Sequence, residues 1–331
     1  MTVPVVYVPQ PVHDRALALL ARHAEVRRGF GPAAVGLPEV LPEVHGILVR
    51  TDPITADDLA RAPHLRVIAR HGIGVDQIDV AAATACGVVV CNTPEANVQA
   101  VAEHTFALLL AVSRRLIAAD RTVRSGRFAD RDGLTGIELS GRQLGIVGMG
   151  RIGTAVARIG GPGFGMSVVG FDPALDAETI RQRGAEPVDL DELLRRSDVL
   201  TVHVPLTPAT RGLIGAAELA RMPAHAVVLQ VSRGGVVDED ALVAALHAGR
   251  LAGAGVDVFA SEPPAADCGY FTLPNVVLSP HTGAHTTAAM ERMAVGAAEA
   301  VLAALRGETP DGVVNPEVLA STAAPRAAAG R

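Results

Sequence analysis

The sequence contains no lysine, so all 29 of its basic residues are arginine. This absence excludes a Schiff-base lysine and the phosphate-binding lysine of a Walker-type loop. It also excludes any dehydrogenase that uses lysine as its proton donor. A step that needs a side-chain cation must therefore use arginine, whose guanidinium can bind a carboxylate through two parallel hydrogen bonds.

Cysteines and long apolar runs are also scarce. Cys86, Cys91 and Cys268 are odd in number and lack metal-ligand spacing, so we interpret them as reduced structural residues and expect no metal site. No apolar run is long enough to span a membrane, and the N-terminus lacks a basic-then-apolar signal pattern. The formal net charge of −6 argues against nucleic-acid binding. We therefore expect a cytoplasmic protein with small-molecule partners.

What the sequence does contain is a glycine motif between two apolar runs. The first run begins at Leu144 and leads into the pattern G-x-G-x-x-G, formed by Gly148, Gly150 and Gly153. The second run ends on Asp172, which lies 19 residues beyond the third glycine. In such a strand–turn–helix–strand unit the glycines permit a tight turn, close approach of a pyrophosphate and close helix packing. The pattern predicts a dinucleotide site at a helix N-terminus.

Asp172 also indicates which dinucleotide binds. A carboxylate at this position accepts hydrogen bonds from the adenosine ribose and repels a 2′-phosphate, whereas an arginine there would bind that phosphate. The run 171–175 contains no basic residue. The sequence therefore favours NAD over NADP.

The rest of the chain alternates predicted strands and helices, which is typical of an open α/β fold. Before the motif, strands are expected at 3–8, 46–49, 66–69 and 88–91, with helices at 13–24 and 98–119. From the motif onward, six strands are expected at 144–148, 167–171, 198–203, 226–231, 254–258 and 276–279. A last helix should cover 287–305, and the polar stretch 120–143 should form an exposed arm. The length of 331 residues suits two domains.

Several further stretches, read with the glycine motif, resemble the D-isomer-specific 2-hydroxyacid dehydrogenase family. They are Val101-Ala102-Glu103-His104-Thr105, His203-Val204-Pro205-Leu206-Thr207, Val231-Ser232-Arg233-Gly234-Gly235, Gly255-Val256-Asp257-Val258-Phe259-Ala260-Ser261-Glu262-Pro263 and Leu278-Ser279-Pro280-His281-Thr282-Gly283. The likeness is greatest to the 3-phosphoglycerate dehydrogenases of that family. That comparison rests on Val49-Arg50-Thr51, Ala69-Arg70-His71-Gly72-Ile73-Gly74 and Asn92-Thr93-Pro94-Glu95-Ala96-Asn97.

The resemblance implies an α/β fold of two Rossmann-like, doubly wound domains with a cleft between them. Residues 1–97 and 286–331 would form a flavodoxin-like substrate domain, and 98–285 the NAD-binding Rossmann domain. Members are usually dimeric through the nucleotide domains, which fits the expected arm, so a homodimer is predicted.

The resemblance also implies a catalytic triad. Arg233 would bind the substrate carboxylate and polarise the carbonyl group, His281 would exchange a proton with the substrate oxygen, and Glu262 would orient His281 and favour its charged form. The residue types suit these roles, because a guanidinium matches a carboxylate and histidine titrates near neutral pH.

Further roles follow from the same resemblance. Cofactor contacts are expected from Gly148, Gly150, Arg151, Ile152, Gly153, Asp172, Val204, Pro205, Thr210, Val231, Ser232, Asp257 and Gly283. The substrate carboxylate would also meet the backbone of Ile73 and Gly74. Arg50 and Arg70 either bind a second anionic group of the substrate, such as a phosphate, or form structural salt bridges. His104 is interpreted as a helix residue buried at the domain junction rather than a catalyst.

One segment departs from the family pattern. Gly160, Gly161 and Pro162 should end the nucleotide-binding helix near Ile159, and the following loop looks one residue longer than usual.

The resemblance implies an NAD-dependent enzyme that interconverts a D-2-hydroxy acid and its 2-oxo acid. Its substrate and one alternative from another class remain open. The chain could act on 3-phosphoglycerate and 3-phosphohydroxypyruvate or on another substrate with a second anionic group. It could instead reduce hydroxypyruvate or glyoxylate. In a different class, it could be a non-catalytic, NAD(H)-sensing interaction protein of the same fold.

Overall fold

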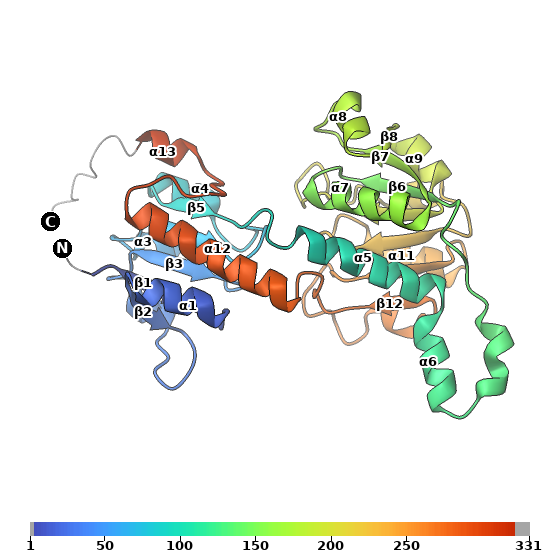
Figure 1. The fold of residues 1–331 in the computed structure, drawn as a ribbon, viewed down its shortest axis with the longest axis horizontal. Helices are drawn as coiled ribbons and strands as arrows, with labels where there is room; N and C mark the ends of the chain where they lie inside the picture. The colour runs from blue at the N-terminus through green and yellow to red at the C-terminus, as the bar shows by residue number, and fades with distance from the viewer. Residues whose placement is uncertain (1–2, 322–331) are drawn as a thin grey trace. The chain divides into compact units, whose positions relative to one another are not determined.

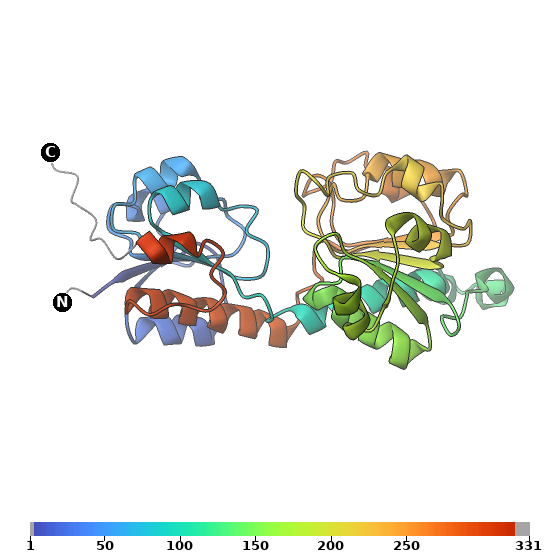
Figure 2. The same cartoon turned by 90° about the horizontal axis from the view of Figure 1, so that it is seen from above.

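The computed structural model describes residues 3–321, which divide into two compact units. Unit 1 comprises the chain up to Asn97 together with the part from His285 onward, and unit 2 runs from Val98 to Ala284. Each unit has its own parallel sheet with helices on both faces (Figures 1 and 2). The α/β class expected from the alternating pattern is confirmed.

Unit 1 contains a five-stranded parallel sheet in the order β2-β1-β3-β4-β5, the flavodoxin-like order. Its strands are β1 Val5–Val8, β2 Glu25–Arg28, β3 Gly46–Val49, β4 Val67–Arg70 and β5 Val89–Cys91. Its helices are α1 Asp14–Ala21, α2 Leu37–Val40, α3 Ala56–Ala60, α4 Val80–Ala85, α12 Thr287–Leu305 and α13 Glu317–Ser321. Alternate strand residues pack against α1 and α12 on one face and against α2, α3 and α4 on the other.

Unit 2 contains a seven-stranded parallel sheet in the order β12-β11-β10-β9-β6-β7-β8. Its strands are β6 Gln143–Val147, β7 Ser167–Phe171, β8 Glu186–Pro187, β9 Val199–Val202, β10 Val227–Gln230, β11 Gly253–Val256 and β12 Val276–Leu278. Its α-helices are α5 Val98–Ser113, α6 Leu116–Arg124, α7 Arg151–Arg158, α8 Ala177–Gln182, α9 Leu190–Arg196, α10 Ala216–Leu219 and α11 Glu239–His247. The strand order reverses between β6 and β9, where open α/β sheets bind their ligands.

Both faces of the unit 2 sheet are buried, as a parallel sheet requires. One core lies under α9, α10 and α11, and the other lies under α5 and α7. Figure 2 shows these helices on opposite sides of the strands. All six strands expected from the motif onward are present, and β8 is an additional two-residue edge strand. The sequence pattern also missed β2, whose four residues carry two arginines and a glutamate.

The long helix expected over 98–119 is interrupted, so that expectation was wrong. α5 ends at Ser113, and α6 starts at Leu116 after Arg115, whose φ of 49° lies in the left-handed region. The backbone thus changes direction, and α6 with the 3₁₀ helix η1 (Phe128–Leu134) forms the projecting arm of unit 2 (Figure 1). The apolar run carried no signal for this turn, because arginine rarely adopts a left-handed conformation.

The glycine-rich segment after α7 does not form the loop that the sequence suggests. α7 ends at Arg158, one residue before the predicted end, but the chain continues as a π-helix over Ile159–Gly163 with Pro162 inside it. A π turn absorbs an extra residue without ending the helical path. Gly160 permits this course, because a Cβ there would lie 2.5 Å from a methyl group of Leu144 on β6.

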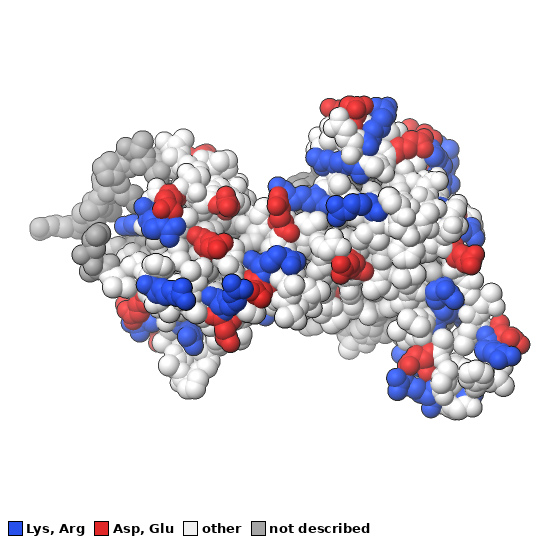
Figure 3. Space-filling view, viewed as in Figure 1, with Lys and Arg blue, Asp and Glu red and all other residues white. Residues whose placement is uncertain are grey.

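Within residues 3–321, no helix combines the length and apolar character needed to cross a bilayer. Acidic and basic side chains are interspersed on the face seen in Figure 3, where every blue residue is arginine.

Candidate active site

The glycine motif forms a tight turn between β6 and α7. Gly148 has φ of 96°, and a Cβ there would lie 2.7 Å from the carbonyl carbon of His203 and 2.8 Å from the backbone nitrogen of Val204. At Gly153 a Cβ would lie 2.0 Å from the carbonyl oxygen of Gly148. Both positions therefore require glycine, the first for its backbone conformation and the second for close packing of helix against turn.

The N-terminus of α7 can bind an anion. Gly150 is its N-cap residue and provides no side-chain cap, and Arg151 and Ile152 form the first turn. A Cβ on Gly150 would meet no atom within 4 Å. The first N–H groups of a helix are good phosphate donors, because no carbonyl group of the helix accepts them. The turn and helix thus suit the pyrophosphate of a dinucleotide.

Asp172 lies beside this turn, at the end of β7. One oxygen of its carboxylate accepts from the N–H of Met149 and the other from the N–H of Ala174, both at 2.9 Å. The carboxylate is therefore held where an adenosine ribose would lie if the pyrophosphate contacts α7, as the motif predicts. These residues fit NAD.

The loop after β9 contains three more of the predicted cofactor residues. Val204 is buried against the glycine turn and Pro205 is exposed. The Thr210 hydroxyl donates to the carbonyl of Pro205 at 2.6 Å and accepts from the N–H of Thr207 at 2.8 Å. Thr210 therefore holds the loop in shape through contacts within the loop itself.

His281 and Glu262 form a hydrogen-bonded pair at the carboxyl ends of β12 and β11. His281 Nδ1 lies 2.8 Å from Glu262 Oε2, and both side chains are more than a third exposed. The other oxygen of Glu262 accepts from the N–H of Phe259 at 3.2 Å. Partial burial opposes ionisation, but the hydrogen bond from His281, the N–H of Phe259 and the charge of Arg233 together lower the pKa of Glu262. Glu262 is thus an anion that orients the ring and leaves Nε2 available on its other side.

Arg233 reaches this region from the end of β10. Its Nη1 donates to the carbonyl of Ser232 at 2.7 Å, and its backbone carbonyl accepts from Gln230 Nε2 at 2.8 Å. The neighbouring Gly234 brings the two loops together, because a Cβ there would lie 1.8 Å from the carbonyl oxygen of Phe259. The structure therefore brings together the three residues that the sequence predicts as a triad.

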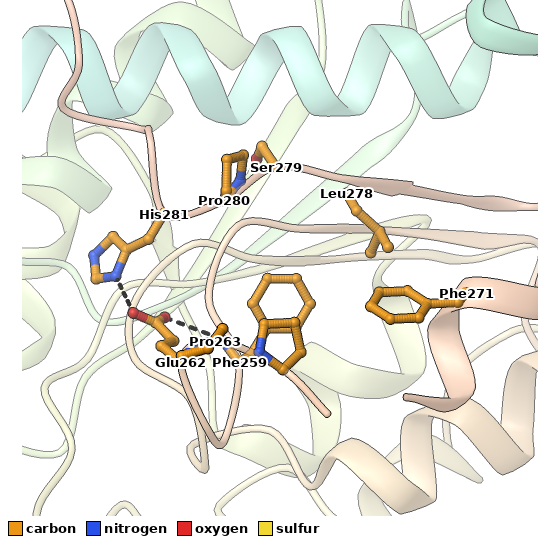
Figure 4. Close-up of a pocket in the computed structure, with 9 residues that line it drawn as sticks. Phe259, Glu262, Pro263, Phe271, Leu278, Ser279, Pro280 and His281 are labelled. Carbon is orange, nitrogen blue, oxygen red and sulfur yellow. Dashed lines mark hydrogen bonds and ion pairs between the residues drawn. The ribbon is translucent and has the colours of Figure 1, made fainter. Parts of the chain in front are cut away.

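A pocket of about 450 Å³ opens beside the histidine–glutamate pair. Besides that pair, Figure 4 shows its lining of apolar groups from the ends of β11 and β12 and from the 3₁₀ helix η3 (Gly269–Thr272), among them Phe259, Pro263, Phe271 and Leu278. The polar pair thus lies at the edge of an apolar surface, where electrostatic interactions are stronger than in bulk water.

Asp257 is 2% exposed and lies immediately after β11. Burial opposes its ionisation, but hydrogen bonds from His104, Ser279, Thr282 and Gly283 lower its pKa to about 2. Of the other residues predicted at the nicotinamide end, Val231 and Ser232 are buried after β10, and Gly283 donates its N–H to Asp257 at 2.9 Å.

Four of the six predicted substrate residues, Arg50, Arg70, Ile73 and Gly74, lie in unit 1 at or after the carboxyl ends of β3 and β4. Arg50 Nη2 lies 3.4 Å from His285 Nε2, and Arg70 Nη1 donates to the carbonyl of His71. The loop containing Ile73 and Gly74 is tied to the chain beyond β5 by a 2.8 Å hydrogen bond from Asn92 to the carbonyl of Ile73.

Sequence reasoning missed three side chains of the unit 2 site. Gln230 holds the backbone of Arg233, while His104 and Ser279 contact Asp257. His104 and Ser279 lie within the family motifs and Gln230 directly precedes one, but a hydrogen bond between distant segments leaves no spacing pattern. His104 is not a fully buried helix residue, because 21% of its side chain is exposed.

Comparisons with known proteins agree with this geometry. The family model described as D-isomer specific 2-hydroxyacid dehydrogenase, NAD binding domain, matches residues 106–283. The D-3-phosphoglycerate dehydrogenase of Mycobacterium tuberculosis is 43% identical over 327 residues, covering 96% of this chain and 61% of that protein. The glyoxylate reductase of Korarchaeum cryptofilum is 40% identical over 323 residues, covering 96% of this chain and 97% of that protein.

The fold also has similar counterparts among solved structures. The crystal structure of the TT0316 protein from Thermus thermophilus has a TM-score of 0.86 and 38% sequence identity, covering 94% of this chain and 99% of that one. The present chain spans about three fifths of the length of the phosphoglycerate dehydrogenases it matches. On the family match and these identities, the chain belongs to the D-isomer specific 2-hydroxyacid dehydrogenase family and contains its NAD-binding domain.

Proposed function

We propose that the chain catalyses the NAD-dependent interconversion of a D-2-hydroxy acid and its 2-oxo acid, with Arg233, Glu262 and His281 as the catalytic residues. The observation that supports this most is the 2.8 Å contact between His281 Nδ1 and Glu262 Oε2 near the Arg233 guanidinium. All three residues lie within the segment that matches the NAD-binding domain.

Each side chain has a defined task in this reaction. NAD supplies or accepts the hydride when bound. In the reducing direction, the Arg233 guanidinium binds the substrate carboxylate and polarises the carbonyl group, while protonated His281 gives its Nε2 proton to the carbonyl oxygen. The carbonyl carbon gains a hydride and the oxygen becomes a hydroxyl. In the oxidising direction, neutral His281 removes the hydroxyl proton. Glu262 stabilises the imidazolium in both directions.

The turn geometry supports the pyrophosphate and ribose contacts, and the family resemblance implies the other cofactor contacts. Gly148, Gly150 and Gly153 with the first turn of α7 would hold the pyrophosphate, and Asp172 the adenosine ribose. Val204, Pro205 and Thr210 would border the adenosine, while Val231, Ser232, Asp257 and Gly283 would lie toward the nicotinamide.

We further propose that the substrate has a second anionic group, as 3-phosphohydroxypyruvate does, and that unit 1 is the substrate domain. Arg50 and Arg70 place two guanidinium groups at the carboxyl edge of its sheet, and both residues are partly exposed. Burial and the charges of Arg50 and Arg70 lower the pKa of His71 to about 4, so this edge carries the arginine charges and a neutral histidine. The backbone at Ile73 and Gly74 would hold the substrate carboxylate.

The test is to follow NADH absorbance with a panel of 2-oxo acids. The panel contains 3-phosphohydroxypyruvate, phosphonopyruvate, sulfopyruvate and 2-oxoglutarate, which carry a second anionic group, and hydroxypyruvate, glyoxylate and pyruvate, which do not. Preference for the first set supports the whole proposal. Preference for hydroxypyruvate or glyoxylate keeps the triad and removes the second-anion site. NADH binding without turnover of any compound contradicts the proposed reaction and favours an NAD(H)-sensing protein.

We also propose a homodimer formed through the arm of unit 2. Leu116, Ile117, Val123 and Phe128 on α6 and η1 are 45–63% exposed. An adjoining groove of about 860 Å³ is lined by residues of α5, α6 and the β12 region. Apolar side chains gathered on one exposed segment are typical of an interface. Light scattering during size-exclusion chromatography tests this, since Phe128→Ser with Leu116→Ser should yield monomers.

A further inference from the structure

A chain of polar groups lies against the loop that contains His281. His104, on the second turn of α5, places Nε2 2.9 Å from the hydroxyl oxygen of Ser279. That hydroxyl lies 2.6 Å from Asp257 Oδ1, and His104 Nε2 is itself 3.2 Å from the same oxygen. Three segments far apart in the sequence therefore meet at one carboxylate.

The direction of the hydrogen bonds follows from the charge of Asp257. Because its pKa is lowered to about 2, the carboxylate is ionised and can only accept hydrogen bonds. Ser279 must therefore donate to Asp257, and the N–H at Nε2 of His104 is shared between the Ser279 oxygen at 2.9 Å and Asp257 Oδ1 at 3.2 Å. The histidine is thus the first donor of a short relay.

Asp257 in turn holds the loop that follows Ser279. Its carboxylate accepts from the N–H groups of Thr282 and Gly283, each at 2.9 Å, and its backbone carbonyl accepts from the N–H of His281 at 2.8 Å. Three successive N–H groups are therefore bound to one residue. A change in the position of Asp257 would move the backbone on both sides of the His281 ring.

The backbone of His281 needs such support. Its φ of 53° lies in the left-handed region, which is unfavourable for a residue with a Cβ. Residues keep such a conformation where the surrounding structure imposes it. His104 also packs on the loop directly, because a Cβ added to Gly283 would lie 3.5 Å from the ring of His104 and 3.0 Å from Asp257.

We propose that His104 is a positioning residue for the reaction: acting through Ser279 and Asp257, it fixes the loop 279–283 and so places the His281 ring against Glu262. This inference rests on the proposed function. It differs from a packing role for His104, in which only the volume of the side chain matters.

Two substitutions separate the roles. His104→Leu keeps most of the volume and removes the donor, whereas His104→Gln places an amide N–H near the position of Nε2. We expect His104→Leu to lower kcat about 10- to 100-fold on the best 2-oxo acid, because small misplacements of a catalytic group have effects of this size. His104→Gln should retain kcat within about threefold of the parent.

A second readout does not depend on turnover. The ring resonances of His281, assigned by comparison with His281→Gln in histidine-labelled protein, should shift or broaden in His104→Leu and stay in place in His104→Gln. His247→Leu, at an exposed position on α11, is the matched control and should leave them unchanged. If His104→Leu does not fold, Ser279→Ala removes the middle of the relay with little change in volume and should reproduce the loss of kcat.

Unchanged kcat and unchanged His281 resonances in His104→Leu overturn the proposal. Equal losses in the leucine and glutamine variants also overturn it and favour simple packing. If the parent protein turns over no 2-oxo acid, the proposed reaction fails, but the resonances of His281 still decide whether His104 positions the ring.

Discussion

The carboxyl edges of the two sheets hold buried titratable groups under opposite conditions. In unit 2, Asp257 is 2% exposed, and four hydrogen-bond donors outweigh its burial and keep it ionised. In unit 1, His71 is 4% exposed, and burial together with the charges of Arg50 and Arg70 keeps it neutral. Equal burial thus gives a charge in one place and none in the other, because the neighbouring groups decide which form is stable.

The same comparison separates the expected tasks of the two edges. The edge of unit 2 combines an anion, an arginine and a histidine, and the histidine can exchange a proton, so changes there should alter kcat. The edge of unit 1 presents arginines that bind without exchanging protons, so changes there should alter KM.

The largest effect is expected at His281. His281→Gln should lower kcat by about 10²- to 10⁴-fold, since the general acid–base is lost. Because the side chain is 46% exposed, the melting temperature should change little. Steady-state kinetics with NADH and a calorimetric scan measure the two quantities. A variant that retains a tenth or more of the parent kcat excludes His281 as the proton donor.

A smaller effect on binding is expected in unit 1. Arg50→Gln and Arg70→Gln should each raise the KM for 3-phosphohydroxypyruvate about 10- to 100-fold, the cost of a lost charge-assisted hydrogen bond. The KM for hydroxypyruvate, which lacks the phosphate, serves as the internal control and should change far less. Equal KM values for 3-phosphohydroxypyruvate in parent and variants would remove the second-anion site and break the division of tasks.

The contrast between neutral His71 and ionised Asp257 predicts that each makes the stability of the protein depend on pH in a different range. The pKa of His71 falls from 6.5 to about 4 on folding, so the unfolded chain binds more protons between these values. Stability is complete above pH 6.5 and falls by about 3 kcal/mol as the pH drops to 4. Asp257, lowered from 3.8 to about 2, contributes about 2 kcal/mol above pH 3.8 that is lost only as the pH falls through 2.

Thermal unfolding at pH 7.5 and pH 5 tests the first of these windows. The drop in melting temperature from pH 7.5 to pH 5 should be several degrees smaller in His71→Gln than in the parent. His23→Gln, at an exposed position of unit 1, is the control and should behave as the parent does. An identical loss in parent and His71→Gln would show that His71 does not cause the acid sensitivity.

The smallest effect is expected at Asp172, the carboxylate beside the glycine turn. Asp172→Asn keeps an acceptor for the ribose and removes the charge that repels a 2′-phosphate. The ratio of kcat/KM for NADPH to that for NADH should rise about tenfold, as expected when about 1.4 kcal/mol of repulsion is removed. Initial rates with both cofactors measure the ratio, and no change in it would remove Asp172 as the selectivity residue.

The sequence determined the parts of this protein whose signals are local. Glycine spacing predicted the turn at Gly148 and Gly153, and apolar runs predicted the buried strands, because both depend on a few neighbouring residues. Family motifs predicted Arg233, Glu262 and His281 as a group; in the structure His281 contacts Glu262, and the charge of Arg233 acts on Glu262. The short strands β2 and β8 were not predicted, because the residues of β2 are largely polar and β8 has too few residues to form a pattern.

Only the tertiary structure decided which distant groups meet. The turn at Arg115 and the π turn around Pro162 were not predicted, because no residue type at these positions indicates either backbone conformation. The contact of His104 with Ser279 and Asp257 joins α5 to the ends of β12 and β11, segments separated by more than 150 residues. Hydrogen bonds and charge states of this kind depend on distance in space. For that reason the sequence could predict which residues carry the chemistry, and only the fold shows which groups contact them.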